Sequence, residues 1–159
     1  MESDSHCLST VTDRNVEMNL KHQYLNENSY VSEVLTKIES SKTDKIKNNK
    51  VLTVGCSVGR IPLELGKLFK ESVGIDYTTR YFQMSTRLKM FGFLKLKDVE
   101  IDLKSMKIEK DNVSFMQMNP ENPDKNKINE CDLIMIDGYS IRKGTLKEVI
   151  KSMIQLTAR

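Results

Sequence analysis

Two glycines separated by three residues follow a short apolar run in this chain. Residues 51–54 are mostly β-branched and apolar, which is typical of a strand buried on both faces of a parallel sheet, and Gly55 ends the run. The second glycine, Gly59, allows a tight turn, and apolar residues then recur at helical spacing over 61–69. A strand, a glycine turn and a helix in this order predict a nucleoside site.

An acidic residue completes this pattern. A second short strand, over 72–75, ends in Asp76, about 20 residues after the glycine turn, where Rossmann-type folds place an acid on the ribose hydroxyls. A carboxylate there can accept charge-assisted hydrogen bonds from both hydroxyls of the diol. The glycine turn and Asp76 therefore predict a single adenosine site.

The same turn partly fits other motifs. It matches the G-x-S-x-G nucleophile elbow of serine hydrolases, but that fold needs a histidine downstream, and His6 and His22 both precede Ser57. A dinucleotide fold would need glycines where Ser57 and Arg60 stand. A P-loop is excluded because the Gly-Lys-Ser/Thr ending is missing. A tight turn without a ligand remains an alternative.

Length and composition exclude several classes of protein. The chain has 159 residues, a length that indicates one domain. Its formal net charge is +3, and its lysines are interleaved with polar and acidic residues, so no nucleic-acid groove is expected. No apolar run approaches the roughly 20 residues of a membrane span, and residues 1–25 lack the features of a signal peptide. Three scattered cysteines predict reduced thiols and no metal site. We expect a cytoplasmic protein that binds neither membrane nor nucleic acid.

The pattern along the chain predicts an α/β fold. Residues 1–28 are polar and are expected to form a weakly ordered arm or part of a lid, while 29–159 form the domain. We expect strands at 51–55, 72–76, 113–118 and 131–136, helices at about 30–38, 60–69, 79–91 and 146–154, an extended insert or hairpin at 93–112, and a polar loop at 120–130. This order favours a doubly wound, mostly parallel sheet.

Four segments resemble motifs of the Rossmann-like S-adenosylmethionine-dependent methyltransferases. They are residues 51–59, 74–76, 115–119 and 132–134, and together they cover most of 45–155. Within 55–82 the sequence is also similar to the C-terminal methyltransferase domain of the ovothiol-synthesis enzyme, which methylates a ring nitrogen of mercaptohistidine. The resemblance implies S-adenosylmethionine as the cofactor, a small-molecule methyl acceptor and a role in ovothiol biosynthesis.

The resemblance also implies a role for individual residues. The turn residues Gly55, Cys56, Ser57 and Gly59 would lie under the methionine and ribose of the cofactor, Asp76 would bind the ribose diol, Tyr77 would stack near the adenine, and Met118 and Asn119 would line its edge. Asp137, Gly138 and Tyr139 would face the methyl group and the acceptor, with Asp137 and Tyr139 as candidates to orient that acceptor. For Cys56, packing is an alternative to a ligand contact.

The sequence departs from the family pattern at its C-terminal end. The family fold adds three strands after the fourth strand and its helix, so the core is expected to be truncated, either as a fragment or as a truncated relative. The fourth strand would then be an exposed apolar edge, which a protein partner or an oligomer would cover. Thr53 and Asn119 also differ from the family motifs. The alternative function is therefore a noncatalytic module that binds S-adenosylmethionine or another nucleoside.

Overall fold

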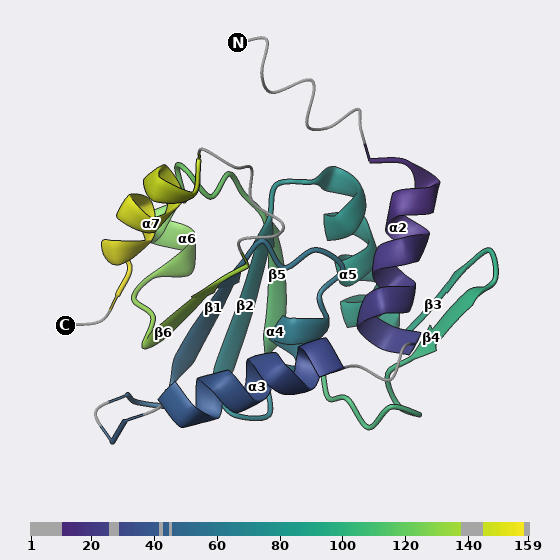
Figure 1. The fold of residues 1–159 in the computed structure, drawn as a ribbon, viewed down its shortest axis with the longest axis horizontal. Coiled ribbons are helices and arrows are strands. Elements are labelled where there is room, and N and C mark those ends of the chain that lie inside the picture. Colours follow the sequence, from purple (N-terminus) through teal and green to yellow (C-terminus); the bar gives the residue numbers. More distant parts are fainter. Residues whose placement is uncertain (1–10, 26–28, 42, 45, 138–144, 158–159) are drawn as a thin grey trace, which may run out of the picture.

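A four-stranded parallel sheet forms the centre of the protein. The structure is a computed structural model that describes residues 11–25, 29–41, 43–44, 46–137 and 145–157. The sheet has the order β5 (Val113–Gln117), β2 (Glu71–Asp76), β1 (Lys50–Val54) and β6 (Leu133–Ile136), as Figure 1 shows. Val54 is in register with Ile75 on one side and with Ile136 on the other. The carboxyl ends of these three strands therefore lie at one edge of the sheet.

Helices cover both faces of the sheet. On one face, alternate residues of β1 and β2 pack with α7 (Leu146–Ile154) and α6 (Lys125–Ile128). On the other face, Val51 packs with α3 (Ser29–Ser41) and α4 (Arg60–Leu65). All five residues of β1 are buried, because this strand is central and has helices on both sides. The predicted doubly wound, mostly parallel sheet is confirmed.

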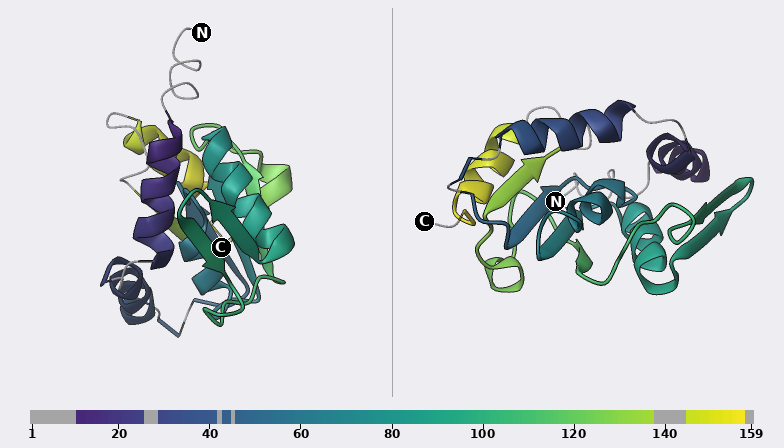
Figure 2. Two further views of the ribbon diagram at one scale, coloured as in Figure 1. Left: turned by 90° about the vertical axis from the view of Figure 1, so that its right-hand side faces the viewer. Right: turned by 90° about the horizontal axis from the view of Figure 1, so that it is seen from below.

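A second hydrophobic cluster lies at one end of the sheet. It joins α2 (Asp13–Leu20) and the π-helical turn η1 (Lys21–Leu25) to α5 (Thr79–Phe91) and to the hairpin of β3 (Phe93–Leu96) and β4 (Val99–Asp102). The hairpin and α7 lie at opposite ends of the molecule (Figure 2, right). The expectation of weak order therefore does not hold for residues 13–25, whose buried side chains are spaced at helical intervals: Val16, Leu20 and Tyr24.

Most expected elements are present with small shifts. The helix at 79–91 and the hairpin within 93–112 are confirmed. The predicted helix at 60–69 ends earlier, at Leu65, and Asn112 Nδ2 donates to the carbonyl oxygens of Gly66 and Phe69 beyond it. The loop expected at 120–130 contains α6, because Asp124 caps that short helix by accepting from the Asn126 N–H.

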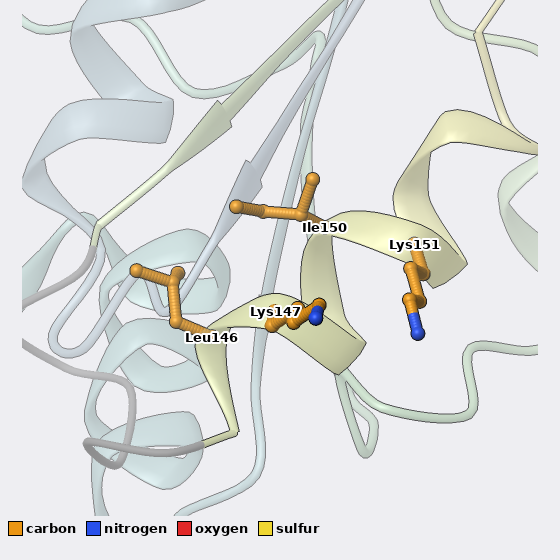
Figure 3. A pocket seen from close by; sticks show the side chains of 4 residues that line it. All are labelled: Leu146, Lys147, Ile150 and Lys151. Carbon is orange, nitrogen blue, oxygen red and sulfur yellow. The ribbon is translucent and has the colours of Figure 1, made fainter.

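The last strand of the sheet has one neighbour. Among the residues that the structure describes, β6 pairs with β1 and with no other strand. Residues of α7 line an open hollow, where Leu146 and Ile150 are exposed (Figure 3). A partner that covers this edge stays a prediction. No described helix is long and apolar enough to cross a membrane.

Candidate functional site

The turn after β1 is held in an unusual backbone conformation. Gly55 has φ 77°, Ser57 has φ 51° and Gly59 has φ 91°, which are left-handed values that favour glycine. The backbone N–H groups of Gly55 and Cys56 both donate to the carbonyl oxygen of Ile75, at 3.0 and 3.1 Å. The turn is therefore fixed to the end of β2, where Asp76 follows.

Asp76 and the turn form one unit, as the spacing predicted. One carboxylate oxygen of Asp76 accepts from the Ser57 N–H at 2.8 Å and the other accepts from the Thr78 N–H at 2.8 Å. Asp76 is 7% exposed, and this burial raises the pKa of its carboxyl, while the two backbone donors oppose that rise. The site thus centres on a buried carboxylate that two N–H groups hold in place.

The other side chains of the turn serve packing and bracing. Burial and the nearby charge of Asp76 raise the pKa of the Cys56 thiol well above its ordinary value, so this thiol is a poor nucleophile. The Ser57 hydroxyl donates to Asn19 Oδ1 at 3.3 Å. The one described histidine, His22, packs against the ring of Tyr30. This arrangement gives no support to a serine hydrolase. The described residues also contain no cluster that could hold a metal ion.

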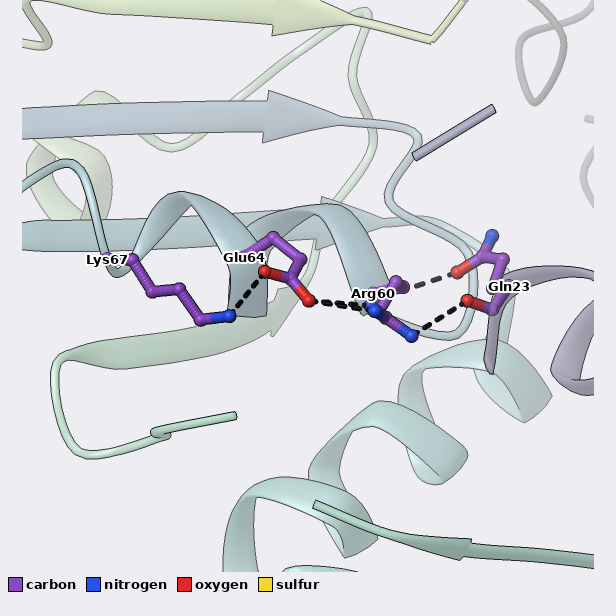
Figure 4. Close-up of polar contacts among 4 residues, drawn as sticks. All are labelled: Gln23, Arg60, Glu64 and Lys67. Atoms are coloured by element: carbon purple, nitrogen blue, oxygen red, sulfur yellow. Dashed lines mark hydrogen bonds and ion pairs between the residues drawn. The ribbon is translucent and has the colours of Figure 1, made fainter. Parts of the chain in front are cut away.

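The N-terminal segment, for which the sequence left an arm or part of a lid as alternatives, contacts the turn through residues that the sequence did not single out. The Tyr24 hydroxyl donates to the carbonyl oxygen of Val58 at 2.8 Å. Gln23 Oε1 accepts from the Arg60 N–H at the start of α4, and the Gln23 carbonyl oxygen accepts from the Arg60 guanidinium (Figure 4). Because Gly59 has no side chain to cap α4, Gln23 supplies that cap from a distant segment.

The same corner contains an ion-pair network around the buried Glu64 carboxylate. Glu64 accepts from Arg60 at 2.8 Å and from Lys67 at 2.7 Å (Figure 4), and the Arg60 guanidinium also lies 5.5 Å from the centre of the Tyr24 ring. Arg60 is therefore committed to Glu64, Gln23 and Tyr24. Its guanidinium lies along α4, where it bonds to Glu64 one turn further on.

Removing the cap tests how much the N-terminal segment contributes. We expect Gln23→Ala to lower the free energy of unfolding by about 1–2 kcal/mol, because it leaves the Arg60 N–H without its acceptor and opens a gap at a buried side chain. Urea unfolding followed by circular dichroism measures this change. Gln155→Ala is the control, since Gln155 is exposed and its side-chain oxygen accepts from the exposed Lys125. Equal losses in both variants would contradict the capping role.

The residues expected around the adenine lie at the carboxyl edge of the sheet, and their side chains range from half-buried to buried. Tyr77 and Asn119 are half-buried. Met118 follows β5, donates its N–H to the Asp76 carbonyl oxygen, and is buried in the cluster that also contains α7. Asn119 Oδ1 accepts from the Glu121 N–H, which fixes the turn after Met118. The adenine contacts of these three residues stay predictions.

Of the residues expected on the acceptor side, the structure describes Asp137. Its N–H donates to the Val54 carbonyl oxygen at 2.9 Å, next to the glycine turn. Gly138 and Tyr139 lie outside the described residues. Sequence reasoning missed Tyr30, whose hydroxyl donates to Asp137 Oδ2 at 2.9 Å, because Tyr30 appeared only as one member of the apolar stripe of α3.

Several solved structures resemble the fold of this chain. A methyltransferase from Clostridium acetobutylicum ATCC 824, described as S-adenosylmethionine-dependent, matches with a TM-score of 0.59 at 13% identity. The plantazolicin methyltransferase in complex with S-adenosylhomocysteine matches with a TM-score of 0.59 at 13% identity. The magnesium protoporphyrin IX methyltransferase from Synechocystis PCC 6803, also with bound S-adenosylhomocysteine, matches with a TM-score of 0.57 at 13% identity. The fold is that of the Rossmann-like methyltransferases.

The matches cover nearly all of this chain but only part of each neighbour. They cover 93%, 98% and 95% of this chain but 55%, 52% and 58% of the other chains. The chain thus spans little more than half of each neighbour. No protein family matches the sequence, and no curated protein matches it. At this identity the methyltransferase fold is shared, while the narrower likeness to a mercaptohistidine methyltransferase finds no support among these three neighbours.

Proposed function

We propose that this chain binds S-adenosylmethionine at the carboxyl edge of its sheet and transfers the methyl group to a small molecule. The observation that carries the proposal is the buried Asp76 carboxylate, held at the end of β2 beside the left-handed turn of Gly55 and Gly59. Ligands of open α/β sheets bind at this edge. The methyltransferase fold of the solved neighbours, two of which hold S-adenosylhomocysteine, supports the same cofactor.

The residues present fit such a cofactor. Each oxygen of a carboxylate can accept more than one hydrogen bond, so Asp76 can hold the Ser57 and Thr78 N–H groups and also accept from the two ribose hydroxyls. The turn itself would lie under the ribose and the methionine part. Tyr77, Met118 and Asn119 would frame the adenine, since they follow β2 and β5 at the same edge.

Methyl transfer requires mainly that the protein hold the cofactor and the acceptor in the right position. S-adenosylmethionine supplies a sulfonium methyl group that is already activated, so in-line transfer benefits most from alignment and exclusion of water. Asp137, beside the turn, would orient an N–H or O–H of the acceptor and stabilise the positive charge that develops on it. No buried base is required for a neutral nitrogen acceptor.

We propose mercaptohistidine as the acceptor, in ovothiol biosynthesis and in the cytoplasm. The support for this choice is the sequence likeness within residues 55–82. The chemistry is consistent with it, because an imidazole with an unperturbed pKa near 6.5 is largely neutral at pH 7 and therefore nucleophilic. A negatively charged Asp137 would favour such a neutral acceptor over an anionic one.

Calorimetry followed by a transfer assay tests the proposal. We expect S-adenosylmethionine to bind and ATP not to bind, because ATP shares the adenosine but the turn lacks the Gly-Lys-Ser/Thr sequence that cradles phosphates. Methylation of mercaptohistidine is then followed by mass spectrometry. Binding without transfer to any tested acceptor would favour the noncatalytic module, and failure of S-adenosylmethionine to bind would contradict both functions.

A further inference from the structure

A tyrosine from α3 reaches the acceptor end of the sheet. The hydroxyl of Tyr30, in the first turn of α3, donates to Asp137 Oδ2 at 2.9 Å across 107 positions of sequence. Both residues are half-buried. Burial and the hydrogen bond to Asp137 raise the pKa of Tyr30, so its hydroxyl keeps the proton that it donates throughout the neutral range. The phenol of Tyr30 therefore remains a hydrogen-bond donor to the Asp137 carboxylate at neutral pH.

Asp137 stands on the ligand side of the glycine turn. Ile136 is in register with Val54, so Asp137 lies beside Gly55, and its N–H donates to the Val54 carbonyl oxygen. The charge of Asp137 contributes to raising the pKa of both Asp76 and Cys56. The carboxylate that Tyr30 holds is therefore close to Asp76, the residue that would bind the ribose of the cofactor.

The π-helical turn η1 also contacts Tyr30. The His22 ring lies 5.6 Å from the Tyr30 ring at an angle of 34°. The next two residues of η1, Gln23 and Tyr24, contact Arg60 and Val58 of the glycine turn and the start of α4. One short segment thus contacts both the cofactor turn and the residue that holds Asp137. Helical segments of this kind are frequent at functional sites.

We propose that Tyr30 is a positioning residue that fixes the Asp137 carboxylate on the acceptor side of the methyl group, so that Asp137 orients an acceptor that carries an N–H or O–H. This inference rests on the proposed function. Tyr30 does not touch the reacting atoms, and it acts by restricting rotation of the Asp137 side chain through one hydrogen bond to Oδ2. A carboxylate held in one orientation costs less to align when the acceptor arrives.

Nuclear magnetic resonance of bound S-adenosylmethionine, labelled with carbon-13 in its methyl group, tests this inference without turnover. We expect Tyr30→Phe and Asp137→Asn each to change the chemical shift of the bound methyl group, because each alters the carboxylate that faces it. The double variant should show the same shift as Asp137→Asn alone, since Tyr30 acts through Asp137. The affinity of Tyr30→Phe for S-adenosylmethionine should stay within about twofold of the wild type, because Tyr30 does not touch the cofactor.

Turnover gives a second readout. With mercaptohistidine, Tyr30→Phe should lower kcat by about tenfold, the loss expected for one hydrogen bond to a charged group, and leave the KM for S-adenosylmethionine unchanged. Thermal unfolding checks that the variants are folded. A methyl shift that is unchanged in Tyr30→Phe, or that adds to the change from Asp137→Asn, overturns the inference alone. Absence of a bound methyl signal in the wild type overturns the proposed function and this inference with it.

Discussion

Asp76→Asn is expected to weaken binding of S-adenosylmethionine by about 100-fold, or ~3 kcal/mol, because two charge-assisted hydrogen bonds are lost or reversed. The carboxylate already accepts from the Ser57 and Thr78 N–H groups. An amide has a single acceptor oxygen and turns an NH₂ group toward one of these donors. Calorimetric titration of the folded variant measures the loss.

A matched control lies at the opposite edge of the sheet. Asp132 Oδ2 also accepts from two backbone N–H groups, those of Asn49 and Lys50, at 3.2 and 2.9 Å. Asp132→Asn makes the same change of residue type, and its single amide oxygen can keep both hydrogen bonds. The affinity should stay within about twofold of the wild type, since ligands bind at the carboxyl edge. If Asp76→Asn binds as tightly as the Asp132 variant, the ribose contact is wrong.

The same carboxylate predicts how affinity depends on pH. Burial raises the pKa of Asp76, so the affinity should fall as the pH drops through a value above the ordinary aspartate value of about 3.9. Because the pKa in the folded state is above that in the unfolded chain, protonation of Asp76 itself favours the folded state. A loss of affinity for S-adenosylmethionine at low pH would therefore not come from unfolding caused by protonation of Asp76. Circular dichroism at each pH measures whether the protein is still folded.

Gly59→Ala is expected to lower the free energy of unfolding by about 2–4 kcal/mol, with a backbone part and a packing part. Gly59 has φ 91°, which strains any residue with a side chain. A Cβ at this position would lie 2.8 Å from the Phe115 ring and 2.9 Å from the Ser85 Cβ. The glycine is needed where α4 starts close to β5 and α5. Urea unfolding followed by circular dichroism measures the change.

Gly92→Ala separates the backbone cost of an alanine at positive φ from the cost of crowding its Cβ. Gly92 also has a positive φ, of 68°, at the end of α5, but the nearest atom to an added Cβ is Lys110 Cε at 3.6 Å. Only the backbone cost of about 1 kcal/mol is expected there. Equal losses in the two variants would show that close packing against Phe115 contributes nothing.

Several parts of this protein could be predicted without coordinates. The apolar run of β1, the glycine turn and the acid at the end of β2 predicted a parallel sheet with a site at its carboxyl edge, and the structure joins them through the Ser57 to Asp76 hydrogen bond. Helix α5 was predicted at its observed bounds, because a clear apolar stripe ends at Gly92. Local patterns suffice where neighbouring residues determine the conformation.

The N-terminal segment shows where such patterns were insufficient. Its polar composition predicted a weakly ordered arm or part of a lid, but the three buried apolar residues of α2 and η1 pack against α5 and the hairpin. An isolated helix of 8 residues, such as α2, is too short to be stable on its own. The partners that bury it are supplied by residues far along the chain, and no local pattern reveals them.

The sequence by itself determined the sheet, the turn and the position of Asp76, since each follows from the periodicity and residue types of one continuous stretch. Only the tertiary structure decided that Gln23 caps α4 and that Tyr30 holds Asp137. These contacts join segments separated by 37 and 107 positions. Their formation depends on how helices pack over the sheet, because a side chain's partner is set by the space that the whole fold leaves around it.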